Sequence, residues 1–221
     1  SILMSAVEAI SPLVRSGSIL ITKSTVPIGT FIEVERVLNR TDVSVASNPE
    51  FVREGSAVYD FLHPDRIVIG SGDAEVAHRV AAIFNSLDSP VLITDSASAE
   101  AIKHASNSFL AVKLSYINAI AIMCELYGAD AIDVARGIGL DSRIGSGFLT
   151  PGPGWGGSCF PKDTSALLQM AHARGYEFAI LREAIAVNQA VQDRIVEKVC
   201  SSITGDIRGK KIAVWGLTFK A

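Results

Sequence analysis

The sequence has little cysteine, and the cysteines it has are poorly spaced for cross-linking or metal binding. Its three cysteines, Cys124, Cys159 and Cys200, form neither a CxxC pair nor a Cys/His pair at metal-ligand spacing. An odd number of distant cysteines argues against a disulfide framework and is typical of a protein kept in the reducing cytoplasm. The four histidines show no ligand spacing either, so we expect no metal site.

An excess of one charge is also lacking. The formal net charge of the 221 residues is −3, and no run of like charges occurs. Such a chain offers no basic field for a nucleic acid and no charged, disordered tail. We therefore expect no nucleic-acid partner.

Targeting and membrane segments are missing as well. No Arg-led or Lys-led apolar segment with a small-residue cleavage site opens the chain, so the sequence predicts no signal peptide. The most apolar stretch, residues 108–128, approaches membrane-spanning length but contains Lys113, Asn118 and Glu125. Each of these is costly inside a bilayer, so we interpret the stretch as a buried helix and expect no membrane partner.

The first part of the chain alternates between short apolar runs and helical patterns. Four runs typical of buried strands occupy residues 18–22, 43–47, 66–70 and 90–94. Helical periodicity lies at residues 31–38 and 75–87, and residues 1–17 read as an amphipathic helix, as if the chain began partway through a domain. The alternation predicts an α/β fold with a parallel sheet covered on both faces.

The chain after residue 97 has a helical pattern. Residues 98–127 contain neither Gly nor Pro and predict one helix of about 45 Å, long enough to bridge two domains. Further helical patterns cover residues 130–137, 163–175 and 177–203. A last apolar run, residues 210–216, predicts a strand that opens a further domain. The expected domains are residues 1–97, 98–205 and 206–221.

A glycine-rich loop precedes Cys159 in the stretch GPGWGGSCFPKD, residues 152–163. Gly152, Gly154 and Gly157 satisfy the letters of the G-x-G-x-x-G dinucleotide fingerprint. That fingerprint requires a strand before it and a helix opening inside it, and neither is indicated here. We interpret the glycines as allowing the backbone to approach a ligand closely.

Cys159 is the strongest candidate for chemistry. It lies just before an expected helix N-terminus and three residues before Lys162, and both features favour a thiolate nucleophile. The alternative is a loop cysteine without chemistry. Cys124 and Cys200 lie on apolar helical patterns and are interpreted as small apolar residues of the core.

Lys103 and Asn107 are four residues apart on the expected long helix and so share a face. Together they form a donor pair that can stabilise an oxyanion when Cys159 attacks a carbonyl. The alternative is a solvated helix face.

Two further groups of polar residues are candidates. Glu50 and Glu54 would align if their segment were helical, for general base catalysis or for gripping sugar hydroxyls; the alternative is ordinary surface charge. Ser24 and Thr25 follow an expected strand, at the edge where open α/β sheets bind ligands.

Taken together, these segments resemble the nucleotide-sugar dehydrogenase family. The resemblance is carried by GPGWGGSCFPKD, NPEFVREGSAVYDFLHPDRIVIG, KSTVP, KHASN and RIGSGFL, whose order and spacing run through essentially the whole chain. It implies the C-terminal part of an NAD-binding Rossmann-like domain, a central helical domain that forms dimers, and the start of a second Rossmann-like, UDP-binding domain. The glycine fingerprint for NAD would precede residue 1, and the rest of the UDP-binding domain would follow residue 221.

The resemblance also implies an activity. The motifs are most similar to the branch that oxidises UDP-glucose to UDP-glucuronate with NAD, in two hydride transfers through a cysteine thioester, for cytoplasmic synthesis of surface-polysaccharide precursors. Alternatives are a GDP-mannose or UDP-N-acetylmannosamine dehydrogenase, a non-catalytic dimerisation module, and a cysteine hydrolase that uses one of the histidines.

Roles for individual residues follow from the same resemblance. Cys159 resembles the nucleophile, and Lys103 and Asn107 resemble the oxyanion donors. Asp163 resembles the acid that orients Lys103 and the attacking water. Thr25 and Glu50 resemble the residues that hold or activate that water. The implied cofactor contacts are Ser24, Thr25, Val26, Glu54, Cys159 and Lys162.

Substrate contacts are implied in the same way. Arg143 resembles an arginine that reaches the substrate of a neighbouring subunit, residues 148–156 resemble a loop that wraps uridine and sugar, and Phe219 and Lys220 resemble contacts to the UDP phosphates. The full implied set is Glu50, Phe51, Val52, Arg53, Glu54, Lys103, Asn107, Arg143, Phe148, Leu149, Thr150, Gly152, Gly154, Trp155, Gly156, Phe219 and Lys220.

Overall fold

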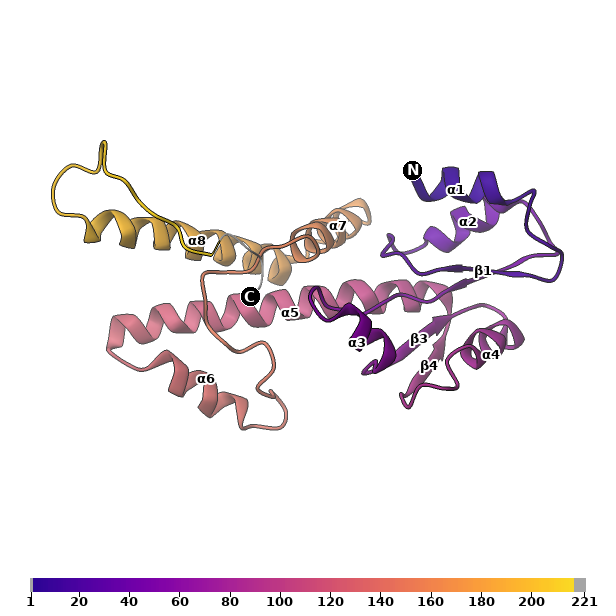
Figure 1. Cartoon of the computed structure of the whole chain (residues 1–221), viewed down its shortest axis with the longest axis horizontal. Coiled ribbons are helices and arrows are strands. Elements are labelled where there is room, and N and C mark those ends of the chain that lie inside the picture. The colour runs from indigo at the N-terminus through magenta and orange to yellow at the C-terminus, as the bar shows by residue number, and fades with distance from the viewer. Residues whose placement is uncertain (1, 217–221) are drawn as a thin grey trace. The chain divides into compact units, whose positions relative to one another are not determined.

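The structure, a computed structural model, describes residues 2–216. The chain divides into two compact units, residues 1–105 and residues 106–221. Helix α5 (Ser96–Tyr127) begins in the first unit and continues into the second (Figure 1). The single helix predicted over residues 98–127 is therefore confirmed.

The first unit contains a four-stranded sheet. Its strands, in the order in which they pair, are β1 (Ile19–Thr22), β2 (Ser44–Ser47), β3 (Ile67–Gly70) and β4 (Val91–Thr94). All four predicted strands are confirmed, and the α/β class with them. The expectation of an all-parallel sheet is wrong, because β1–β2 and β3–β4 are parallel but β2 meets β3 antiparallel.

The antiparallel step has a local cause. The chain that leaves β2 does not cross over the sheet but continues beside β3, where Asn48 Nδ2 donates to the Val68 carbonyl at 2.8 Å. Only Ser47 and Gly70 form a ladder pair between the two strands. A connection that leaves one strand and enters the next at the same end of the sheet makes the two strands antiparallel.

Helices cover both faces of the sheet, as predicted. Helices α1 (Ile2–Ile10) and α2 (Thr30–Leu38) pack on the face that carries Val45, and α4 (Ala74–Ala82) packs on the face that carries Ala46 (Figure 1). Because successive side chains of a strand point to opposite faces, these two neighbours belong to separate cores.

The prediction that residues 90–94 form a buried strand is only half right. Strand β4 forms, but Val91, Leu92 and Ile93 are 39–48% exposed. The reason is its place at the edge of the sheet order, where one side has no strand partner among the described residues.

The second unit is all helical, as predicted. It contains the rest of α5 together with α6 (Ala131–Gly139), α7 (Phe160–Ala173) and α8 (Ala179–Ser202). Figure 1 shows α6 and α8 on opposite sides of the C-terminal half of α5. Ile117 of α5 packs against Ala135 of α6 and Leu149. Helix α7 begins earlier than the expected cap at Asp163, because Pro161 fits the first turn of a helix.

Helix α5 is long and apolar enough to cross a membrane by length and composition alone, but a single core helix of a soluble protein passes the same test.

Residues 210–216 form no strand, against expectation, and Trp215 is fully exposed. A strand requires a partner, and no partner is present among residues 2–216.

Candidate active site

A small cleft lies at the carboxyl ends of β1 and β2 in the first unit. Its lining is rich in hydroxyl groups and comprises Thr22, Ser24, Thr25, Val26, Ser47, Pro49, Glu100 and Lys103. Ser24 and Thr25 thus stand at the edge where open α/β sheets bind ligands. The cleft, at about 10 Å³, has room for a single water molecule, so its polar lining offers hydrogen-bonding groups at this edge but not a ligand-sized pocket.

Lys103 is held inside the first unit and is not on a solvated face. Its ammonium donates to the Glu50 carbonyl at 2.7 Å and lies 3.3 Å from Glu50 Oε1. The same ammonium lies 5.3 Å from the centre of the Phe51 ring, which also stacks with the Arg66 guanidinium at 3.9 Å. Only 5% of Lys103 is exposed, so the alternative of a solvated face is wrong for this residue.

Glu100 and His104 lie on the same turns of α5, and neither was assigned a role from its residue type. Glu100 accepts hydrogen bonds from the backbone N–H groups of Gly29 at 2.6 Å and Phe31 at 3.0 Å and so caps the N-terminus of α2. Burial raises the pKa of the Glu100 carboxyl, while these hydrogen bonds oppose the rise. His104 Nε2 donates to the Val26 carbonyl at 2.8 Å. These two contacts fix the loop that carries Ser24 and Thr25.

The NPEFVREG segment is a loop and not a helix, because α3 (Ala57–Leu62) begins only after it. The expected helical alignment of Glu50 and Glu54 is therefore wrong. The loop is held by Asp60, which accepts from the Arg53 backbone N–H at 2.8 Å and from its Nε at 3.0 Å. This guanidinium holds the pKa of the Asp60 carboxyl well below its usual range. Ser56 adds a third donor at 2.9 Å.

In the second unit, Cys159 is exposed and occupies the N-cap position of α7. The Asp163 backbone N–H donates to the Cys159 carbonyl at 2.9 Å, so the Asp163 carboxylate stands one turn from the thiol. Cys159 therefore has the accessible helix-start setting that its sequence predicted, whereas Cys124 is buried and Cys200 is exposed, against its expected place in the core.

Asp163 is 3% exposed and its Oδ2 accepts from the Asn107 amide at 2.6 Å. Its Oδ1 lies 2.8 Å from the Lys162 ammonium, but no group among the described residues donates an aligned hydrogen bond to it. The Asp163 carboxylate is therefore held by an amide on one oxygen and by an ammonium on the other. Asn107 is also buried, so the alternative of a solvated face is wrong here too. One turn of α5 separates Asn107 from Lys103.

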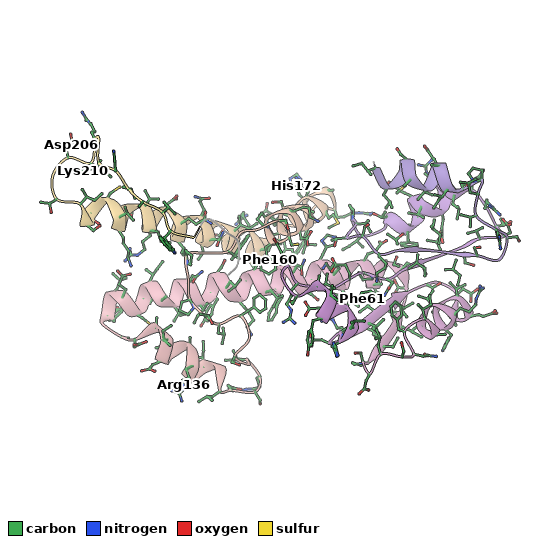
Figure 2. All side chains as sticks on the ribbon, viewed as in Figure 1. Phe61, Arg136, Phe160, His172, Asp206 and Lys210 are labelled. Carbon is green, nitrogen blue, oxygen red and sulfur yellow. The ribbon has the colours of Figure 1, made fainter. Side chains whose placement is uncertain are left out.

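The loop before Cys159 is tied down by side chains that the sequence analysis missed. Asn118 Oδ1 accepts from the Gly152 N–H at 2.8 Å, and Asn188 bonds both backbone groups of Trp155. Trp155 is buried, and its ring meets Phe160, the first residue of α7 (labelled in Figure 2), edge-on at 6.2 Å. The amide type of Asn118 and Asn188 inside apolar helices was the one available signal.

The remaining predicted residues lie in different settings. Phe148 has a left-handed backbone at φ 60° and meets Phe160 edge-on, whereas the Leu149 side chain is in the core. Arg143 is exposed and paired with Asp141 at 2.6 Å. Half-buried Val52 donates its N–H to Glu50 at 2.8 Å, and Thr150 is exposed. Phe219 and Lys220 lie outside the described residues. Among residues 2–216, no group of three His, Cys, Asp or Glu residues is placed to hold a metal ion.

Two segments match family profiles. Residues 1–88 match the UDP-glucose/GDP-mannose dehydrogenase family, NAD binding domain, and residues 97–190 match the UDP-glucose/GDP-mannose dehydrogenase family, central domain.

Two curated proteins of similar sequence are named UDP-glucose 6-dehydrogenase. The chain is 47% identical to a UDP-glucose 6-dehydrogenase of Rhizobium meliloti (strain 1021), over 100% of this chain and 52% of that protein. It is also 47% identical to one of Bacillus subtilis (strain 168), over 97% of this chain and 50% of that protein. The chain therefore spans about half the length of these relatives.

Solved structures agree in fold. A UDP-glucose dehydrogenase from the hyperthermophilic archaeon Pyrobaculum islandicum superimposes with a TM-score of 0.87 at 39% identity, covering 90% of this chain and 48% of that one. A UDP-D-ManNAc dehydrogenase from Pyrococcus horikoshii has a TM-score of 0.81 at 24% identity, over 91% and 49% of the two chains, which supports the fold alone.

Proposed function

Because the chain belongs to the UDP-glucose/GDP-mannose dehydrogenase family, we propose that the protein that carries it oxidises UDP-glucose to UDP-glucuronate with NAD. The observation that carries the proposal is the exposed Cys159 at the start of α7, one turn from the buried Asp163–Asn107 pair. A thiol at a helix N-terminus is favoured as an anion and is open to a carbonyl carbon.

The choice of sugar rests on the relatives. Two curated proteins at 47% identity are named UDP-glucose 6-dehydrogenase. A solved GDP-mannose dehydrogenase is 27% identical, against 39% for the solved UDP-glucose enzyme. UDP-glucose is therefore the preferred substrate over GDP-mannose or UDP-N-acetylmannosamine.

The described residues fit part of an NAD site. The cleft at the ends of β1 and β2 presents the hydroxyls of Thr22, Ser24 and Thr25, which suit ribose and carboxamide groups. Within residues 2–105 no G-x-G-x-x-G turn joins a strand to a helix: the turn between β3 and α4 has Gly70 and Gly72, but the third position is Glu75. We assign Ser24, Thr25, Val26, Glu54, Cys159 and Lys162 to the cofactor. Two NAD molecules, bound one after the other, would each accept one of the two hydrides that leave C6 of the sugar.

Cys159 performs the covalent part of the reaction. The first oxidation turns the C6 alcohol into an aldehyde, and the Cys159 thiolate adds to its carbon to form a C–S bond and an oxyanion. Loss of the second hydride from that carbon leaves a thioester. Water then displaces the thiol, which releases the acid and returns Cys159. Covalent capture keeps the aldehyde from escaping between the oxidations.

Five side chains support these steps. Lys103 and Asn107 donate to the oxyanion, at charge that exists only in the tetrahedral states. Asp163 orients the Lys103 ammonium and the attacking water, and its burial and its bond to Asn107, one turn of α5 from Lys103, support that role. Thr25 and Glu50 hold or activate the water. The tie between the Lys103 ammonium and Glu50 supports this assignment.

Most substrate contacts are assigned to two loops and to Phe219 and Lys220. The NPEFVREG loop contributes Glu50, Phe51, Val52, Arg53 and Glu54. The loop at residues 148–156 lies against the uridine and sugar, and Phe219 and Lys220 meet the phosphates. Arg143, exposed and beside Asp141, reaches the substrate of a second subunit.

We also propose that the protein is a cytoplasmic homodimer formed through the helical domain, assigned to residues 98–205. Phe109, Tyr116 and Met123 are seven residues apart on α5 and 48–64% exposed. Residues at that spacing share one helix face, which gives a continuous apolar stripe for a second copy. A chain that dimerises without binding NAD would instead be a dimerisation module.

The proposal is tested with the full-length protein that carries this chain. NADH is measured with UDP-glucose, GDP-mannose and UDP-N-acetylmannosamine in parallel. We expect two NADH for each UDP-glucuronate formed, and the highest kcat/KM for UDP-glucose. A higher kcat/KM for either other sugar, or no NADH with any of them, would overturn the proposal.

A further inference from the structure

The side-chain amide of Asn188 on α8 hydrogen-bonds both backbone groups of Trp155, as a neighbouring strand in a sheet would. Its Oδ1 accepts from the Trp155 N–H at 2.7 Å, and its Nδ2 donates to the Trp155 carbonyl at 2.9 Å. Both residues are 7% exposed. Buried amides that satisfy both groups of a backbone residue fix its position, because releasing either group leaves it unpaired.

A second helix, α5, holds the Trp155 side chain. The Trp155 indole N–H donates to Ser115 Oγ of α5 at 2.9 Å, and that hydroxyl donates to the Ala184 carbonyl of α8 at 2.6 Å. The backbone N–H, the backbone carbonyl and the indole N–H of Trp155 are therefore all hydrogen-bonded within the protein before any ligand binds.

The residue before Trp155 leaves room for the two hydrogen bonds from Asn188 to the Trp155 backbone, which together are called the grip. Gly154 has φ +101°, and a Cβ added to it would lie 2.7 Å from Asn188 Oδ1. A side chain at position 154 would thus meet the asparagine as well as strain the backbone. The bonds from Asn188 to Trp155 therefore require a glycine at position 154.

We propose that Asn188 is a positioning residue that pre-forms the loop at residues 148–156 for the nucleotide sugar, with Trp155 as its anchor. This inference rests on the proposed function and deepens it. A glycine-rich loop loses much conformational freedom when it becomes ordered. If the loop is ordered beforehand, substrate binding does not carry that loss. The grip therefore acts on substrate affinity and leaves the covalent steps of Cys159 unchanged.

The first test measures the grip without any activity. In the 221-residue chain, Trp155 is the only tryptophan once Trp215, fully exposed, is replaced in Trp215→Phe. Asn188→Ala in this background is expected to shift the Trp155 emission to the red and to increase its quenching by acrylamide. Gln189→Ala, an exposed neighbour bonded only along α8 to Asp193, is the matched control and leaves both unchanged.

Hydrogen exchange provides the same test in the full-length protein. The peptide with Trp155 is expected to exchange at least about tenfold faster in Asn188→Ala, because a buried hydrogen bond is lost. Unchanged emission and unchanged exchange in that variant would overturn the grip.

The kinetic test separates positioning from a loss of structure. Asn188→Ala is expected to raise KM for UDP-glucose about tenfold or more and to leave kcat within about twofold. A protein that is only less well folded loses kcat at unchanged KM. A lowered kcat alone, or an unchanged KM beside a released Trp155, would overturn the positioning role.

A second variant approaches the grip from the loop. Gly154→Ala is expected to reproduce the fluorescence and exchange changes of Asn188→Ala. Gly147→Ala is its control, because an added Cβ there meets nothing within 4 Å. Unaltered fluorescence in Gly154→Ala would contradict the grip. If the full-length protein oxidises no sugar nucleotide, the proposed function fails, while fluorescence and exchange still decide whether Asn188 fixes the loop.

Discussion

Asn107 and Asp163 meet at 2.6 Å through an amide donor and a carboxylate oxygen, and both side chains are buried. The bond joins α5 to the first turn of α7, where Cys159 occupies the N-cap. It fixes one carboxylate oxygen and leaves the other without an aligned donor. The pair therefore orients an acid beside the thiol.

Asn107→Ala is expected to lower both stability and turnover. Loss of a hydrogen bond to a buried carboxylate lowers the free energy of unfolding by about 1–3 kcal/mol. Loss of an oxyanion donor lowers kcat by about 10²–10³. Urea unfolding and the rate of NADH formation measure the two effects. Gln189→Ala, an exposed amide on α8, is the control. Full turnover in Asn107→Ala would remove Asn107 from the mechanism.

Lys103→Met is expected to abolish most activity and to lower stability moderately. Lys103 is 5% exposed and donates to the Glu50 carbonyl at 2.7 Å, so its loss lowers the free energy of unfolding by about 1–3 kcal/mol. As an oxyanion donor, Lys103 is worth about 10² or more in kcat. Lys198→Met, which breaks a pair with Glu125, should change neither quantity greatly. A Lys103→Met protein with ordinary kcat would contradict the assignment.

Asp60 makes stability depend on pH in the acid range. Its pKa in the folded state lies below the unfolded value. The stability it contributes is therefore present above the unfolded pKa of about 3.9 and is lost as pH falls through the folded pKa. Asp60→Asn should be less stable at pH 7, with a shallower loss below about pH 4. Urea midpoints from pH 7 to pH 2.5 provide the measurement, and parallel curves for the two proteins would refute the prediction.

Tyr116→Asp is expected to convert the proposed dimer into a monomer. The change places a charge at the centre of the apolar stripe of Phe109, Tyr116 and Met123, which are 48–64% exposed in one chain, and a charge in an interface core must be desolvated. Sedimentation equilibrium measures the mass. Leu140→Asp, at an exposed residue off α5, should remain dimeric. A wild-type monomer, or a dimeric Tyr116→Asp, would contradict the stripe as the interface.

Local patterns predicted most of the elements. The absence of Gly and Pro between residues 98 and 127 predicted α5, and the short apolar runs predicted all four strands. The direction of β3 was not predicted, because it depends on the path of the chain after Ser47 and not on the composition of the strand. The exposure of β4 escaped for a similar reason, since an edge position is a property of the sheet order.

The candidate site residues were predicted from their residue types, but the residues that hold their loops in place were not. Cys159, Lys103 and Asn107 were found through the chemistry of their side chains. Glu100 and Asn188 were missed because their partners are distant in sequence: Gly29 lies 71 residues from Glu100, and Trp155 lies 33 residues from Asn188. Such pairings arise only from tertiary packing, which a single sequence does not display.

The most direct test of the account is the mass of the peptide that carries Cys159 after a rapid quench of turnover. With UDP-glucose and NAD, the full-length protein should show that peptide bearing a covalent sugar-nucleotide adduct that alkaline hydroxylamine removes, as it does a thioester. The Cys159→Ala protein should show no adduct and form no UDP-glucuronate. UDP-glucuronate released by Cys159→Ala at the rate of the unaltered enzyme would contradict the account.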